Sequence, residues 1–119
     1  GRVFYKSCPV AVDWTGNGLL DLVVFAERAI YLLVNAGEAG QPRLGEPIEI
    51  RPGGERPADG SRFKGCVIDF NGNGALDLVW GNFRHERDVE ARRVEYFGHV
   101  FVAYGQPIER AEEPRLPER

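Results

Sequence analysis

Two short segments rich in aspartate and asparagine contain the residues whose types and spacing best suit the binding of a metal ion. In each segment, oxygen-bearing side chains stand at positions 1, 3, 5 and 9, counted from the first aspartate: Asp13, Thr15, Asn17 and Asp21, and then Asp69, Asn71, Asn73 and Asp77. Calcium takes six to eight oxygen ligands, several of which alternate side chains of a tight loop can supply. Gly18 and Gly74, at position 6, permit the sharp turn. We expect backbone carbonyls at position 7, from Leu19 and Ala75, as further ligands.

The first loop (residues 13–21) and the second loop (residues 69–77) carry fewer charges than a strong calcium site. Each has two carboxylates, and calcium affinity depends on the number of charged ligands. An EF-hand is excluded because Val24 and Trp80 replace its bidentate glutamate at position 12, and because strand-like sequence follows instead of a helix. A second interpretation stays open, in which asparagine and glycine form tight turns without a metal.

Both loops belong to an internal repeat. The segment VDWTGNGLLDLVVF at residues 12–25 recurs as IDFNGNGALDLVWG at residues 68–81, so that 56 residues separate Asp13 from Asp69. Apolar, aspartate, aromatic and glycine positions coincide along the match. Self-similarity of this length within 119 residues indicates two copies of one structural unit.

Short β-strands are expected around each loop. Runs rich in β-branched and aromatic residues predict strands at 8–13, 20–25, 29–35, 46–50, 65–69, 76–81, 99–104 and, weakly, 106–110. A helix over residues 90–104 is a competing interpretation, but Gly98 and the alternation of Val100 with Val102 favour a strand. Four short antiparallel strands per repeat are typical of a propeller blade. We therefore predict an all-β fold with two four-stranded blades of a β-propeller.

The combination of loop and strands resembles the FG-GAP or VCBS repeat, found in integrin α-subunit propellers and in many secreted bacterial proteins. In that family the loop Asp-x-Asp-x-Asp-Gly-x-x-Asp-Leu leads into an apolar strand, and a later strand ends near Asn-x-Gly. Leu22–Val24 and Val34–Gly37 match this pattern, whereas the second repeat has Tyr104 and Gly105 in place of the asparagine. The resemblance covers residues 8–108 and implies a calcium-binding propeller located outside the cell, in the periplasm or at the cell surface. It departs from the family at loop positions 3 and 5, where aspartate is usual.

The chain divides into four expected segments: a lead-in or outer strand at 1–7, a first blade at 8–60, a second blade at 61–110, and a disordered tail or linker at 111–119. Residues 83–95 are additional in the second repeat and predict a projecting hairpin. We favour a solvated hairpin, with a recognition element as the alternative. A metal site formed by His85, Glu86 and Asp88 is a weaker possibility.

The two cysteines precede the loops. Cys8 stands five residues before Asp13, and Cys66 stands three residues before Asp69. Both offsets are odd, so the two thiols would point to the same side of their strands. We predict buried free thiols that act as small apolar side chains; a disulfide between the blades is the alternative for a secreted protein.

The composition restricts the function. A net charge of −3 without a basic run argues against nucleic-acid binding, and no apolar run reaches the roughly 18 residues that a membrane span needs. No nucleophile elbow, zinc motif or phosphate loop is present. We therefore predict a protein that is not an enzyme.

The expected function is that of a calcium-binding repeat module that binds or scaffolds a protein or carbohydrate ligand. The alternatives are a non-catalytic piece of a propeller enzyme, of the polysaccharide lyase or hydrolase type, and a purely structural repeat. Propellers close with four to eight blades, so two blades leave faces without a neighbour. The chain also lacks methionine. We therefore expect neighbouring blades, either in a longer chain or in a homo-oligomeric ring.

Overall fold

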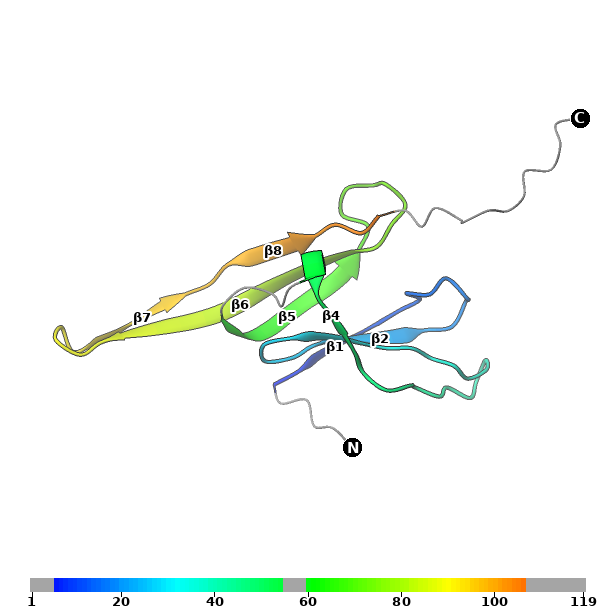
Figure 1. Ribbon diagram of the computed structural model, residues 1–119, viewed down its shortest axis with the longest axis horizontal. Coiled ribbons are helices and arrows are strands. Elements are labelled where there is room, and N and C mark those ends of the chain that lie inside the picture. Colours follow the sequence, from blue (N-terminus) through cyan, green and yellow to red (C-terminus); the bar gives the residue numbers. More distant parts are fainter. Residues whose placement is uncertain (1–5, 55–59, 107–119) are drawn as a thin grey trace, which may run out of the picture.

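The computed structural model describes residues 6–54 and 60–106 and consists of two four-stranded antiparallel sheets, which confirms the predicted all-β class (Figure 1). Sheet 1 contains β1 (Cys8–Val12), β2 (Asp21–Phe25), β3 (Ile30–Leu33) and β4 (Ile48–Ile50). Sheet 2 contains β5 (Ser61–Ile68), β6 (Asp77–Asp88), β7 (Arg93–Phe97) and β8 (Val100–Ala103). A single 3-10 turn, η1 (Pro52–Gly54), follows β4. The described part of the chain holds no helix with the length and hydropathy that a membrane crossing requires.

Sheet 1 is a simple meander whose strands lie in the order β1-β2-β3-β4. The strands predicted for the first repeat are all present, although each is trimmed at one or both ends. The central strand β2, with sequence DLVVF, has four of its five residues buried. A β-branched apolar run without alternation is the pattern of a strand that is covered on both faces.

Sheet 2 is organised around the long strand β6. The first half of β6 pairs with β5 and β8, and its second half pairs with β7 in the register Arg84↔Phe97 to Asp88↔Arg93. Gly98 and His99 separate β7 from β8. The predicted insertion is therefore a hairpin of β7 and the second half of β6, which extends beyond β5, β8 and sheet 1 in Figure 1.

Two predictions for the second repeat are corrected. The strand expected to end at Gly81 continues to Asp88, because β7 provides a pairing partner for charged residues that show no strand-like alternation of apolar side chains. The fourth strand of sheet 2 is β7, whereas the expected strand at 106–110 lies outside the described residues except for Gln106. The expected tail at 111–119, and the lead-in at 1–7 apart from Lys6 and Ser7, also lie outside them.

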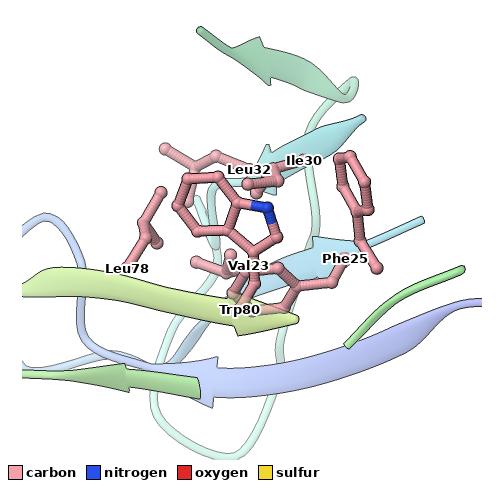
Figure 2. Packing of buried hydrophobic residues seen from close by; sticks show 7 residues of the cluster. Val23, Phe25, Ile30, Leu32, Leu78 and Trp80 are labelled. Carbon is pink, nitrogen blue, oxygen red and sulfur yellow. The ribbon is translucent and has the colours of Figure 1, made fainter. Parts of the chain in front are cut away.

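The hydrophobic core lies between the two sheets. Its buried members are Val23, Phe25, Ile30 and Leu32 from sheet 1, and Phe63, Leu78 and Trp80 from sheet 2. In Figure 2 the indole of Trp80 lies among the side chains of sheet 1. Its ring also stacks on Phe101, with 5.5 Å between ring centroids. Burial of these large apolar side chains, each worth about 1.5–3 kcal/mol, holds the two repeats together.

The two cysteines lie in different environments. Cys8 packs against the core, and its thiol contacts the carbonyl of Gly65 at 3.8 Å. Cys66 is exposed, so the prediction of two buried thiols is wrong for this residue. Both are free cysteines in the structure. The difference arises because the equivalent strands β1 and β5 present opposite faces to the core. The face of β1 that packs on the core corresponds to the face of β5 that points away from it.

Candidate functional site

The first loop connects β1 to β2 and folds around the carboxylate of Asp13. The Oδ1 atom of Asp13 accepts hydrogen bonds from the N–H groups of Gly16 and Asn17, at 2.9 and 3.2 Å. Its Oδ2 atom accepts from Gly18 N–H at 2.8 Å. Gly16 and Gly18 have φ angles of 76° and 86°, in the left-handed region that favours glycine.

The second loop connects β5 to β6 and repeats this arrangement around Asp69. Its Oδ1 atom accepts from Gly72 and Asn73, at 2.9 and 3.1 Å, and its Oδ2 atom accepts from Gly74 at 2.9 Å. The φ angles of Gly72 and Gly74 are 73° and 86°. Two segments that differ at positions 2, 3 and 7 therefore have the same backbone conformation, because position 1 and the glycines determine it.

Asp21, at position 9 of the first loop and the first residue of β2, is fully buried and joins the loop to the segment that follows β3. Its Oδ2 atom accepts from the N–H groups of Trp14 and Thr15, at 3.0 and 3.1 Å, and from the Thr15 hydroxyl at 3.3 Å. Its Oδ1 atom accepts from Asn35 N–H at 2.7 Å. Burial by itself would raise the pKa of Asp21, but the hydrogen bonds from Asn35, Thr15 and Trp14 outweigh burial and lower the pKa below its ordinary value.

Asp77 has the same role in the second loop and is also fully buried. It accepts hydrogen bonds from Phe70 and Asn71 at 2.8 and 3.4 Å, and from Gly105 N–H at 2.7 Å. Gly105 therefore takes the place of Asn35, as the sequence alignment of the two repeats suggested. Only the backbone donor is retained, since glycine has no side chain.

Asn35 is a site residue that the list of predicted ligands did not include. Its side chain is buried; Nδ2 donates to the Leu20 carbonyl at 3.1 Å, and Oδ1 accepts from Gly37 and Arg43 at 2.9 and 3.0 Å. Asn35 thus fastens the end of the first loop to the connection between β3 and β4. The Asn-x-Gly motif was the sequence signal for Asn35. It accounts for the contact with Gly37, but Leu20 and Arg43 lie outside the motif.

The remaining asparagine ligands line the loops, and their side-chain oxygens already accept hydrogen bonds from backbone N–H groups. Asn17 Oδ1 accepts from Leu19 N–H, and Asn73 Oδ1 accepts from Ala75 N–H, at 3.0 Å in both cases. Asn71 Oδ1 accepts from Asn73 N–H at 3.3 Å. Across the described residues no group of three histidine, cysteine, aspartate or glutamate side chains is placed to hold a metal. Any ion in these loops would therefore depend on amide and carbonyl oxygens beside the two carboxylates.

The two loops differ in their capacity for a cation. A carboxylate offers about four lone-pair sites. Asp21 has four donors in the first loop, one of them the Thr15 hydroxyl, so it has no acceptor left for an ion. Asp69 and Asp77 each have three donors and keep about one acceptor site free. Asp13 also has three donors, like Asp69, so the second loop keeps one more free carboxylate acceptor than the first, and the difference is the hydrogen bond from the Thr15 hydroxyl to Asp21.

Both loops border one cleft between the sheets, with a volume of about 650 Å³. The first loop contributes Asp13, Trp14 and Thr15, and the second contributes Gly74 and Ala75. The wall also includes Ile50 of β4, Leu78 of β6, and the segment 103–106. The cleft combines aromatic, apolar and polar groups and lies within the size range of small-ligand sites.

The projecting hairpin does not assemble the metal site considered for it. His85 lies on one face of β6, whereas Glu86 and Asp88 have the opposite parity along the strand. Glu86 instead forms an ion pair with Arg84 at 3.4 Å. The imidazole of His85 lies beside Phe83, with 6.1 Å between the ring centroids.

These observations define an all-β repeat module in which a carboxylate-centred loop between the first two strands of a sheet occurs twice. A model of the FG-GAP-like repeat matches residues 13–80, more than half of the chain. The chain belongs to the FG-GAP-like repeat family. No curated protein and no solved structure matches it.

Proposed function

We propose that this chain is a calcium-stabilised, β-propeller-type repeat module that binds or scaffolds a protein or carbohydrate ligand, outside the cell or at its surface. The observation that carries the proposal is the pair of loops. Buried aspartates fix both loops to the sheets, and both loops border the same cleft. Rigid elements that present adjacent loops are the usual construction of binding surfaces. The family membership supports the same function.

The role proposed for the chain is not catalytic. A general acid at neutral pH needs a carboxyl group whose pKa is raised, whereas the pKa of Asp21 is lowered. The carboxylates of the loops serve as acceptors for backbone N–H groups. These hydrogen bonds explain the spacing of the aspartates, so a catalytic role is not needed to explain it.

Calcium is proposed for the second loop. The side chains of Asp69, Asn71, Asn73 and Asp77 and the carbonyl of Ala75 would hold the ion, which would neutralise the two carboxylates and cross-link the loop. The first loop, Asp13 to Asp21 with Thr15, Asn17 and Leu19, would close without metal, since the Thr15 hydroxyl already occupies Asp21. The two interpretations of the sequence would then each apply to one loop.

Calcium titration of the chelator-treated chain, followed by thermal unfolding, tests the proposal. We expect Tm to rise with calcium, because a ligand that binds only the folded state stabilises it by about 2.7 kcal/mol at 100 times Kd. Asp69→Asn should abolish the response, and the matched change Asp13→Asn should retain it. Asn73→Asp, which adds a carboxylate, should tighten binding. Absence of a calcium response in both the wild-type chain and Asn73→Asp would refute the calcium site.

A further inference from the structure

The two loops contain every asparagine of the chain that a glycine follows. The pairs are Asn17 with Gly18, Asn71 with Gly72, and Asn73 with Gly74. Asparagine before glycine is the sequence most prone to spontaneous deamidation, because glycine has no side chain to hinder its backbone nitrogen from reaching the asparagine side chain. All of these asparagines are exposed, so solvent water reaches them. The chemical condition for deamidation is therefore met in both loops.

Deamidation consists of a cyclisation and a hydrolysis. The glycine N–H gives its proton to solvent, and the glycine nitrogen forms a bond to the side-chain carbon Cγ of the asparagine. The bond from Cγ to Nδ2 breaks, and the side-chain NH₂ takes up a proton and leaves as ammonia. Water then opens the succinimide ring at either carbonyl, which yields aspartate or isoaspartate. Water is consumed and ammonia is released, so the reaction needs no other reactant, and its first step depends on the glycine nitrogen.

In the structure each of these glycine nitrogens donates a hydrogen bond to the aspartate at position 1 of its loop. Gly18 N–H donates to Oδ2 of Asp13 at 2.8 Å. Gly72 N–H donates to Oδ1 of Asp69, and Gly74 N–H donates to Oδ2 of the same residue, both at 2.9 Å. One carboxylate therefore binds both of the nitrogens that could attack in the second loop.

These hydrogen bonds oppose the attack in two ways. The N–H proton must be removed first, and a charged acceptor holds that proton more strongly than a neutral one does. Negative charge also develops on the attacking nitrogen, and a carboxylate at hydrogen-bond distance repels it. Asn73 is held at its side chain as well, since Oδ1 accepts from Ala75 N–H at 3.0 Å and Nδ2 donates to the Gly105 carbonyl at 3.4 Å.

We propose that the asparagine–glycine pairs of the loops are deamidation sites, which Asp13 and Asp69 protect while the loops are folded. The aspartate at position 1 then has a chemical role in addition to shaping the turn. Local opening of a loop releases the glycine nitrogens and permits the reaction. This protection requires neither calcium nor a bound ligand, so it is independent of the function proposed above.

The two products of deamidation affect a loop differently. Aspartate in place of Asn71 or Asn73 keeps a side-chain oxygen that can accept from the same backbone N–H group, and it adds a carboxylate to the second loop. Isoaspartate instead adds a methylene group to the main chain, so the loop no longer closes around Asp69 with the same spacing. The first product preserves the loop, whereas the second opens it permanently.

Incubation of the chain in weakly alkaline buffer with chelator, followed by peptide mass spectrometry, measures deamidation at each asparagine. We expect Asn17, Asn71 and Asn73 to react at least about tenfold more slowly in the folded chain than in the urea-unfolded chain, because a hydrogen bond to a charged group must be broken first. Asp69→Ala should accelerate the reaction in the second loop alone, and Asp13→Ala should accelerate it at Asn17 alone. The unaltered loop of each variant is the matched control.

Equal rates in the folded and the urea-unfolded wild-type chain would overturn the proposal. So would a folded Asp69→Ala variant whose second loop reacts as slowly as that of the wild-type chain, or one in which Asn17 is accelerated as much as Asn71. Circular dichroism shows whether the variant is folded. If Asp69→Ala unfolds the chain, Asp69→Asn takes its place; it keeps one acceptor oxygen and should give a smaller acceleration that is still confined to the second loop.

Discussion

The carboxylate of Asp21 accepts a hydrogen bond of 2.7 Å from the backbone N–H of Asn35, which lies fourteen residues further along the chain. The same carboxylate holds the start of the first loop through Trp14 and Thr15. One buried side chain therefore joins the loop to the end of β3. Within the described residues, in contrast, the donors to Asp13 all belong to its own loop.

Asp21→Asn should destabilise the fold more than Asp13→Asn does. The amide at position 21 would direct an NH₂ group toward backbone N–H donors, and hydrogen bonds to a charged group are worth about 1.5–3 kcal/mol. We expect a loss of at least about 2 kcal/mol for Asp21→Asn and a smaller loss for Asp13→Asn, whose donors are exposed to water. Urea unfolding of the two variants measures the difference. Equal losses of unfolding free energy in the two variants would show that the buried position of Asp21 adds nothing to the stabilisation by its hydrogen bonds.

The contribution of Asp21 to stability should depend on pH. The pKa of Asp21 is lowered in the folded state, whereas an aspartate in the unfolded chain has a pKa of about 3.9. The folded state then binds the proton less readily, so the stabilisation is complete above the unfolded pKa and is lost as the pH falls through the folded pKa.

We therefore expect the difference in unfolding free energy between the wild-type chain and Asp21→Asn to be constant near neutral pH and to shrink below about pH 4. Urea titrations across this range, without calcium, provide the measurement. A difference that stays constant, or that grows on acidification, would contradict the assignment.

Gly65→Ala should weaken the packing of the two sheets. A methyl group at Gly65 would lie 2.8 Å from Trp80 Cβ and 2.9 Å from the Phe25 ring. Overpacking of this kind costs about 1–3 kcal/mol. Gly81→Ala, in the neighbouring strand, is the matched control, because its methyl group would be 3.8 Å from its nearest neighbour. Thermal unfolding should show a lower Tm for Gly65→Ala alone.

The local features of the fold could be predicted from the sequence. The loops are fixed by Asp13, Asp69 and the glycines at positions 4 and 6, whose effect extends over a few residues. The strands of the first repeat follow from β-branched runs between such turns. Both are short-range consequences of residue type.

Other features depend on partners distant in the sequence. The length of β6 could not be predicted because residues Arg84–Asp88 form a strand only by pairing with β7. The exposure of Cys66 depends on which face of sheet 2 meets sheet 1, which the alternation within one strand does not reveal. The saturation of Asp21 by four donors required the positions of Thr15 and Asn35 in space.

The two halves of β6 pair with different strands, the first with β5 and β8 and the second with β7, and this has a consequence for how the repeat can change. The outer half of the hairpin, with its turn at residues 89–92, contributes none of the described core residues, and all four turn residues are exposed. Its length and sequence can therefore vary while the sheets remain intact. The turn is an insertion point where evolution or an engineer can add a foreign peptide at little cost in folding.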